Sequence, residues 1–168
     1  MRTKVIFIFF LTCLFLSSTM VFSQEGYDDV IVYGKKVTIH YTLTVEGQMI
    51  DSSQGKGPLE YVQGEGQLIK GLENSLLGLR VNDEKNIVVH PNDAYGMASA
   101  EKVIKLPRNV FFQGVDIRPG LQVQVIARGG RPNIGAVENA DSRFVTVNFN
   151  HPLAGKTLTF KVKIMSVE

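Results

Sequence analysis

The residue types that most often carry catalysis are sparse and scattered in this sequence. Its three histidines, His40, His90 and His151, fall in separate segments, and no two of them have the spacing of a metal-ligating pair. Neither a Gly-x-Ser-x-Gly elbow nor a Gly-rich phosphate loop is present. We therefore expect each histidine to be a surface or hydrogen-bonded residue, and no site built on a metal or on an activated nucleophile.

A reaction that needs no proton transfer is still compatible with this inventory. Rotation about an X-Pro bond has a barrier of roughly 20 kcal/mol that comes from amide resonance, and an apolar pocket that binds the twisted amide best would lower it. One aromatic residue, Tyr95, also stands out. A lone aromatic in the polar turn 92–96 is hard to explain as core, and its hydroxyl could hold a substrate carbonyl.

The first 23 residues predict a secretory signal peptide. Arg2 and Lys4 precede an apolar stretch over 5–16 and a small-residue end at Ser23, where we expect cleavage. The alternative is an uncleaved anchor over 5–22, which is near the lower length limit for spanning a bilayer. Both readings place the folded part outside the cytoplasm, in the periplasm or another extracytoplasmic space.

The composition is that of a folded protein with little affinity for polyanions. The chain has 168 residues, 44% of them apolar and 20% charged, which excludes a collagenous or generally disordered chain. Its single cysteine, Cys13, lies in the leader, so a disulfide scaffold is excluded. Because Arg2 and Lys4 are also in the leader, the rest carries equal numbers of acidic and basic residues. This balance argues against a nucleic-acid or anionic-membrane partner.

Hydrophobic periodicity predicts an α+β fold in which a bent antiparallel sheet wraps on one short helix. Alternation predicts strands at 37–45, 48–52, 58–62, 84–89 and 158–164, and helical spacing predicts a helix over 68–77 that ends at Gly78. The last strand should close the sheet that the first one begins. These elements assign 34–102 and 148–168 to one domain, preceded by a flexible segment over 24–33.

Residues 103–147 behave as a second, β-rich unit. Strand-like runs at 121–127, 134–137 and 144–149 are separated by glycine-rich and polar turns. Strands of the first unit are predicted both before and after this stretch, so the simplest interpretation is a small domain inserted in a loop.

Four segments together resemble one family. They are Gly-Lys-Lys-Val-Thr-Ile-His-Tyr at 34–41, Gly-Gln-Met-Ile-Asp-Ser-Ser at 47–53, Gly-Gln-Leu-Ile-Lys-Gly-Leu-Glu at 66–73 and Asp-Ala-Tyr-Gly at 93–96. They occur in the order seen in FKBP-type peptidyl-prolyl isomerases. The segments 92–96, 110–116 and 150–155, followed by Phe160, look like the SlyD subgroup, which carries an insert-in-flap chaperone domain. The resemblance implies cis–trans isomerisation of X-Pro bonds in unfolded or partly folded clients.

The resemblance also implies a pocket of ten residues. Its catalytic members would be Tyr41, Asp51, Ile69, Tyr95 and Phe160, and its substrate-binding members Ile50, Leu59, Tyr61, Leu68 and Leu72. Asp51 would have an orienting or electrostatic role, and the backbone N–H at Ile69 would donate to the bound chain. Leu59, Leu72 and Phe160 could equally be plain core. Leu72 stands where many relatives have tryptophan, so a wider pocket is expected.

The inserted unit has its own apolar candidates, Val110, Phe111, Phe112 and Ile117, as a surface for unfolded clients. The alternative is a stabilising extension with Phe111 and Phe112 in its core. We expect a monomer that uses no cofactor and no metal, because the His- and Cys-rich tail of some subgroup members is missing. A non-catalytic envelope holdase and an envelope metal carrier are the competing functions.

Overall fold

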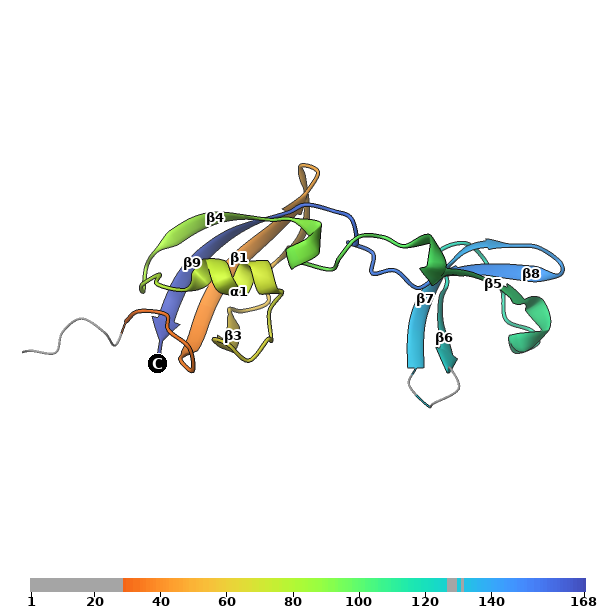
Figure 1. The fold of residues 1–168 in the computed structure, drawn as a ribbon, viewed down its shortest axis with the longest axis horizontal. Helices are drawn as coiled ribbons and strands as arrows, with labels where there is room; N and C mark the ends of the chain where they lie inside the picture. The colour runs from red at the N-terminus through yellow and green to blue at the C-terminus, as the bar shows by residue number, and fades with distance from the viewer. Residues whose placement is uncertain (1–28, 127–129, 131) are drawn as a thin grey trace, which may run out of the picture.

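The computed structural model describes residues 29–126, 130 and 132–168. The predicted signal peptide over 1–23 and the first part of the segment 24–33 lie outside these residues, as does the end of the strand-like run 121–127. Figure 1 shows two lobes connected by two segments of the chain. Among the described residues, none of the helices has the length and apolar character needed to cross a membrane.

The first lobe is a five-stranded antiparallel sheet. Its strands are β1 (Lys36–Val45), β2 (Gln48–Ser52), β3 (Leu59–Val62), β4 (Glu84–Val89) and β9 (Leu158–Val167). The order is β2-β1-β9-β4, with β3 beside the first half of β1. Strands β1 and β9 pair over nearly their full length, so the last strand does close the sheet that the first begins. Glu46 and Gly47 join β1 to β2 with φ of 51° and 81°, the two positive angles of a type I′ turn.

Helix α1 (Lys70–Leu76) lies across one face of this sheet, as Figure 1 shows. Leu72 and Leu76 are buried in the core that the helix shares with strands β1, β4 and β9. The helix is shorter than the predicted 68–77, because Ile69 at its N-cap has an extended backbone and leaves Leu68 outside the first turn. Gly78 follows the helix with a φ of 79°, which a glycine adopts without strain.

Residues 29–33 are attached to the first lobe, so the prediction of a flexible segment over 24–33 is wrong for them. Ile31 is fully buried in the core of the first lobe. Its N–H donates to the carbonyl of Leu79 at 2.8 Å, and its carbonyl accepts from Gly78 at 2.9 Å. The polar and acidic residues before Val30 suggested a loose segment, but one isoleucine with two backbone hydrogen bonds is enough to attach it.

The second lobe is a four-stranded antiparallel sheet in the order β5-β8-β7-β6. Its strands are β5 (Val103–Pro107), β6 (Gln122–Ile126), β7 (Pro132–Ala140) and β8 (Phe144–Asn148), and Ile117, Val137, Val145 and Val147 form its buried core. Strand β5 was not predicted, since none of its five residues is buried and the strand ends at a proline. Two short 3-10 turns, η2 (Ala100–Lys102) and η3 (Arg108–Val110), flank β5, and a third, η1 (Pro91–Asp93), follows β4.

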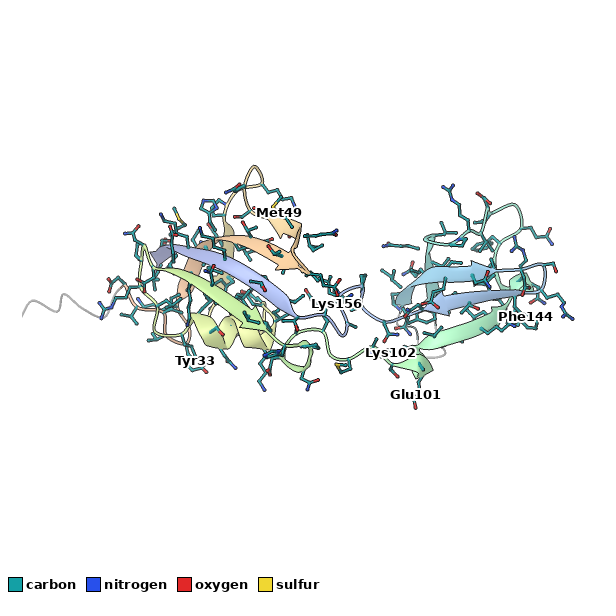
Figure 2. The ribbon with its side chains drawn as sticks, turned by 90° about the horizontal axis from the view of Figure 1, so that it is seen from above. Tyr33, Met49, Glu101, Lys102, Phe144 and Lys156 are labelled. Carbon is teal, nitrogen blue, oxygen red and sulfur yellow. The ribbon has the colours of Figure 1, made fainter. Side chains whose placement is uncertain are left out.

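The two connections between the lobes are tied to each other. The side chain of Asn150 accepts from the N–H of Ser99 and donates to its carbonyl, both at 2.9 Å. The N–H of Gly155 donates to the carbonyl of Gly96 at 2.8 Å. Lys156, at the junction in Figure 2, reaches Glu46 in the β1–β2 turn at 2.6 Å. The outgoing and returning segments therefore form a paired connector.

Candidate active site

A cavity of about 390 Å³ opens between the sheet of the first lobe and the start of α1. Eight of the ten predicted pocket residues line it: Tyr41, Asp51, Leu59, Leu68, Ile69, Leu72, Tyr95 and Phe160. Leu43, Gly66 and Gln67 complete the lining and were not predicted. Leu43, Leu72 and Phe160 are buried, and their surfaces make an apolar floor. The cavity is thus apolar at its base and polar at its rim.

The polar rim is organised around the carboxylate of Asp51. Its Oδ2 accepts from the hydroxyl of Tyr41 at 2.7 Å. Its Oδ1 accepts from Nζ of Lys56 at 2.5 Å and from the N–H of Ser52 at 2.8 Å. Lys56 and Tyr41, followed by Ser52, lower the pKa of Asp51 to about 2, and the bond to Asp51 together with burial raises the pKa of Tyr41 to about 12. At neutral pH the carboxyl is ionised and the phenol protonated, so neither is poised as a general base.

Lys56→Gln is expected to raise the pKa of Asp51 from about 2 toward its usual 3.8, because the lysine is the largest cause of the depression. A carboxyl with a lowered pKa in the folded state stabilises the fold fully above about pH 4 and loses that contribution as the pH falls to about 2. The variant should therefore lose less stability between these two pH values than the unmodified protein. Titration of the Asp51 carboxyl carbon by NMR measures the shift directly.

Lys70→Gln is the control for that titration, because it removes an equal charge from an exposed lysine at the start of α1. It should leave the Asp51 carboxyl unchanged. An Asp51 pKa that stays near 2 in Lys56→Gln would assign the depression to Tyr41 and Ser52 instead.

The start of α1 is positioned by the loop that precedes it. Oε1 of Glu73 accepts from the N–H of Gly64 at 2.9 Å and from that of Gly66 at 3.3 Å. Oε1 of Gln67 accepts from the N–H of Val62 at 2.7 Å. These bonds tie the loop to β3 on one side and to the helix on the other, and so present Leu68 and Ile69 to the cavity. The lining by Gly66 and Gln67 follows from this loop geometry rather than from any apolar pattern.

The prediction that Tyr61 lines the pocket is wrong, because Tyr61 is a core residue. Only 3% of it is exposed, and its hydroxyl donates to Oε1 of the buried Gln63 at 3.0 Å. Gln63 in turn donates from Nε2 to the carbonyl of Glu73 at 2.9 Å. Tyr61 thus stabilises the loop beneath the cavity without lining it. Burial raises the pKa of its phenol, so it stays neutral.

The prediction that Ile50 binds substrate in the pocket is also wrong, because Ile50 does not line the cavity. The pairing of β1 with β2 shifts between Leu43 and Thr44, which face Asp51 and Met49, so Ile50 is the extra residue of a β-bulge. The bulge turns its side chain outward, where 49% of the residue is exposed. The same bulge leaves Asp51 pointing into the cavity. A strict alternation over 48–52 does not anticipate this.

Tyr95 lies at the mouth of the cavity on the turn that follows β4. Its loop is closed by the N–H of Gly96, which donates to the carbonyl of Pro91 at 2.7 Å. The residue is 40% exposed, and its ring stacks on His151 with centroids 3.6 Å apart. Its hydroxyl has no hydrogen-bond partner among the described residues, in contrast to that of Tyr41. Tyr95 therefore presents a free donor to anything that enters the cavity.

The apolar candidates of the second lobe separate into two groups. Val110 and Phe112 are exposed, at 62% and 90%. Ile117 is corrected, because it is 9% exposed and packs in the core of the lobe, and Phe111 packs partly against the same core. The exposure of Phe112 also contradicts the alternative in which both phenylalanines are core. Of the four predicted surface residues, Val110 and Phe112 are therefore the exposed ones.

Comparison with known proteins agrees with the fold of the first lobe. Residues 28–165 match the family model described as FKBP-type peptidyl-prolyl cis-trans isomerase. A probable FKBP-type 16 kDa peptidyl-prolyl cis-trans isomerase of Pseudomonas fluorescens is 37% identical over 134 residues, which cover 79% of this chain and 89% of that protein. The chain belongs to the FKBP-type peptidyl-prolyl cis-trans isomerases, and its first lobe has their fold, with antiparallel strands and one short helix.

The similarity extends to a named group within the family. The FKBP-type peptidyl-prolyl cis-trans isomerase SlyD of Treponema pallidum is 38% identical over 132 residues, covering 78% of this chain and 74% of that protein. A short-type peptidyl-prolyl cis-trans isomerase of Methanocaldococcus jannaschii is 29% identical over 154 residues, or 83% of this chain and 96% of that protein. The chain is thus an isomerase whose SlyD-like character covers most of its length.

Proposed function

We propose that this isomerase acts on X-Pro bonds of unfolded or partly folded polypeptides and that its second lobe holds those polypeptides near the cavity. The observation that carries the proposal is a cavity with an apolar floor of Leu43, Leu72 and Phe160 and a hydroxyl donor at its mouth. Such a cavity suits a proline ring with its preceding carbonyl. It requires no cofactor or metal for bond rotation.

The catalytic effect follows from binding the twisted amide better than either planar form. An apolar floor removes water from the amide, and loss of water favours the less polar twisted state, in which resonance is broken. The Tyr95 hydroxyl donates to the carbonyl that precedes the proline. The Asp51 carboxylate, held by Tyr41 and Lys56, acts through its charge and its fixed geometry. The N–H at Ile69 lies where an extended chain would meet the start of the helix.

Client holding is the part of the proposal that concerns the second lobe. Val110 and Phe112 are exposed, and Phe112 lines a hollow of about 410 Å³ together with Phe111 and Val115. Among the described strands, β5 and β6 each pair along one edge only, so their other edges can accept an extended chain. Both kinds of contact tolerate many sequences. Weak binding here would raise the local concentration of proline segments around the cavity.

Tyr95→Ala tests the isomerase part of the proposal. Refolding of a client that is limited by X-Pro isomerisation has a phase of tens of seconds, which the unmodified protein should accelerate. The variant is expected to lose about tenfold in kcat/KM, because it removes one hydrogen bond and an aromatic wall from the cavity mouth. Equal effects of the two proteins on the refolding rate, with aggregation suppressed by both, would instead identify a non-catalytic holdase.

We also propose that the protein works outside the cytoplasm. The support is the pattern of Arg2, Lys4 and the apolar stretch over 5–16, followed by a small-residue end at Ser23. The N-terminal sequence of the protein recovered from the periplasmic fraction tests this. A chain that begins at Gln24 is the expected result, and a cytoplasmic chain that retains Met1 would contradict it.

A further inference from the structure

The ring of Tyr95 has an aromatic partner that contributes nothing to the cavity lining. The rings of Tyr95 and His151 are stacked, with centroids 3.6 Å apart and planes within 9° of parallel. The two residues are far apart in the sequence and belong to different connections between the lobes. Tyr95 lies on the outgoing segment after β4, and His151 lies on the returning segment after β8.

The imidazole of His151 is itself held in place. Its Nδ1 accepts from the N–H of Leu153 at 3.1 Å, and its carbonyl accepts from the N–H of Ala154 at 2.8 Å. A backbone N–H can only donate, so Nδ1 is the acceptor in this bond and the bond fixes the orientation of the ring. Asn150, the preceding residue, is fixed to Ser99 by two hydrogen bonds. The ring of His151 is therefore a preformed platform.

Tyr95, by contrast, has no side-chain hydrogen bond among the described residues, and its one ring–ring contact there is with His151. It lies in a turn, it is 40% exposed, and Met97 two residues later is 63% exposed. A tyrosine in such a turn would sample several rotamers, and each one other than the stacked rotamer would move the hydroxyl relative to the cavity. Fixing a donor before the substrate arrives removes an ordering cost from the reaction.

We propose that His151 is a positioning residue for the isomerase reaction. Its ring stacks on Tyr95 and holds the phenol hydroxyl at the cavity mouth, without touching the substrate. The proposal rests on the role proposed above for Tyr95. It also means that the geometry of the site depends on the returning connection from the second lobe, and not only on the first lobe.

Two substitutions distinguish the contribution of the His151 ring to the stack from that of its Nδ1 acceptor to the local turn. His151→Asn keeps a side-chain acceptor for the N–H two residues ahead, as asparagine does in an Asx turn, but removes the ring. His151→Phe keeps a flat ring for Tyr95 but removes the acceptor. If the ring is what matters, kcat/KM for a short proline peptide should fall about three- to tenfold in His151→Asn, the range expected for one aromatic pair. His151→Phe should restore most of that loss.

The NMR chemical shifts of the tyrosine ring protons test the stack directly, because they would not change if His151 only stabilised its own turn. The Tyr95 signals are identified by their absence from Tyr95→Phe. They should be displaced by the ring current of residue 151 in the unmodified protein and in His151→Phe, and should return toward free-tyrosine values in His151→Asn. Tyr95 signals that are the same in His151→Asn as in the unmodified protein would overturn the proposal.

The kinetic outcomes distinguish this proposal from the one it rests on. Tyr95→Phe, which keeps the ring and removes the hydroxyl, is expected to lower kcat/KM. Suppose that Tyr95→Phe lowers kcat/KM. If His151→Asn then has the same kcat/KM as the unmodified protein, or if His151→Phe loses as much kcat/KM as His151→Asn, the positioning role of His151 is overturned and the role of the Tyr95 hydroxyl stands. If Tyr95→Phe has no effect, the role of the Tyr95 hydroxyl fails and the proposal for His151 fails with it.

Discussion

Replacement of residues 103–147 by a short glycine-serine linker is expected to lower kcat/KM about a hundredfold on an unfolded protein substrate. The same change should alter kcat/KM for a short proline peptide by no more than a few-fold. The proposed holding role gives the reason. A peptide would need only the cavity, whereas a long client would gain from being held beside it, and tethering of this kind commonly contributes two orders of magnitude or more. Parallel assays with the two substrates measure the difference.

The structure indicates that the deletion leaves the first lobe intact. Val103 and Asn148 face each other as paired residues of β5 and β8, and the N–H of Phe149 donates to the carbonyl of Lys102 at 2.8 Å. The two ends of the deleted stretch are therefore neighbours. The bonds of Asn150 to Ser99 and the stack of His151 on Tyr95 lie on the side that remains. Few residues are needed to bridge the gap.

Combined substitution of Val110 and Phe112 by serine provides the matched comparison, since it keeps the second lobe and removes the two exposed residues of its predicted client surface. It should reproduce a large part of the loss on the protein substrate and none of it on the peptide. Equal losses on both substrates in the deletion variant would mean that the second lobe shapes the cavity and is not a holding surface.

Most of the fold of the first lobe was predictable because its strands have one buried face. The alternation of Val37, Ile39 and Val45 with polar residues identifies β1, and the same pattern in Leu158, Phe160 and Val162 identifies β9. Strand β5 has no such pattern, since Ile104 on it is 43% exposed. Its place is determined by pairing with β8, which is a long-range contact that no local periodicity reports.

The candidate site shows the same division between local pattern and tertiary contact. Leu72 could be placed from its helical spacing with Leu76, whereas Leu68 lies in the loop before the helix. The bulge that turns Ile50 outward arises from the pairing of two strands, and the burial of Tyr61 depends on Gln63 and a helix carbonyl. Lys56 and His151 were missed for a related reason. Neither has a sequence signal that connects it to Asp51 or Tyr95, and their contacts exist only once the chain has folded.

Gly71→Ala is expected to destabilise the first lobe by about 1–3 kcal/mol, the cost of overpacking a close-packed site. Alanine in place of glycine inside a helix is ordinarily favourable by up to about 1 kcal/mol, so the expected sign is reversed. The cause is the close approach of the helix to its neighbours. A Cβ at Gly71 would lie 2.5 Å from Cγ1 of Val89 and 3.2 Å from the carbonyl oxygen of Asp93. Denaturant unfolding measures the change.

The same clash should also reach the cavity and lower kcat/KM for a short peptide by about tenfold. Gly71 lies between Ile69 and Leu72, which line the cavity, and Asp93 lies two residues before Tyr95. Relief of the clash has to separate the helix start from the turn that carries Tyr95, and a small displacement of positioned groups is costly to a reaction. The hydroxyl donor and the apolar floor would no longer meet at one proline.

Gly135→Ala is the control that separates lost stability from a displaced cavity. It is equally crowded, since its Cβ would lie 2.6 Å from Cγ1 of Val147 and 2.9 Å from the carbonyl oxygen of Asn148, but these neighbours belong to the second lobe. It should destabilise that lobe and leave kcat/KM for the short peptide unchanged. Equal losses of peptide activity in both variants would mean that the two lobes unfold together. A fully active Gly71→Ala protein would show that the helix and the Tyr95 turn can separate without cost to the reaction.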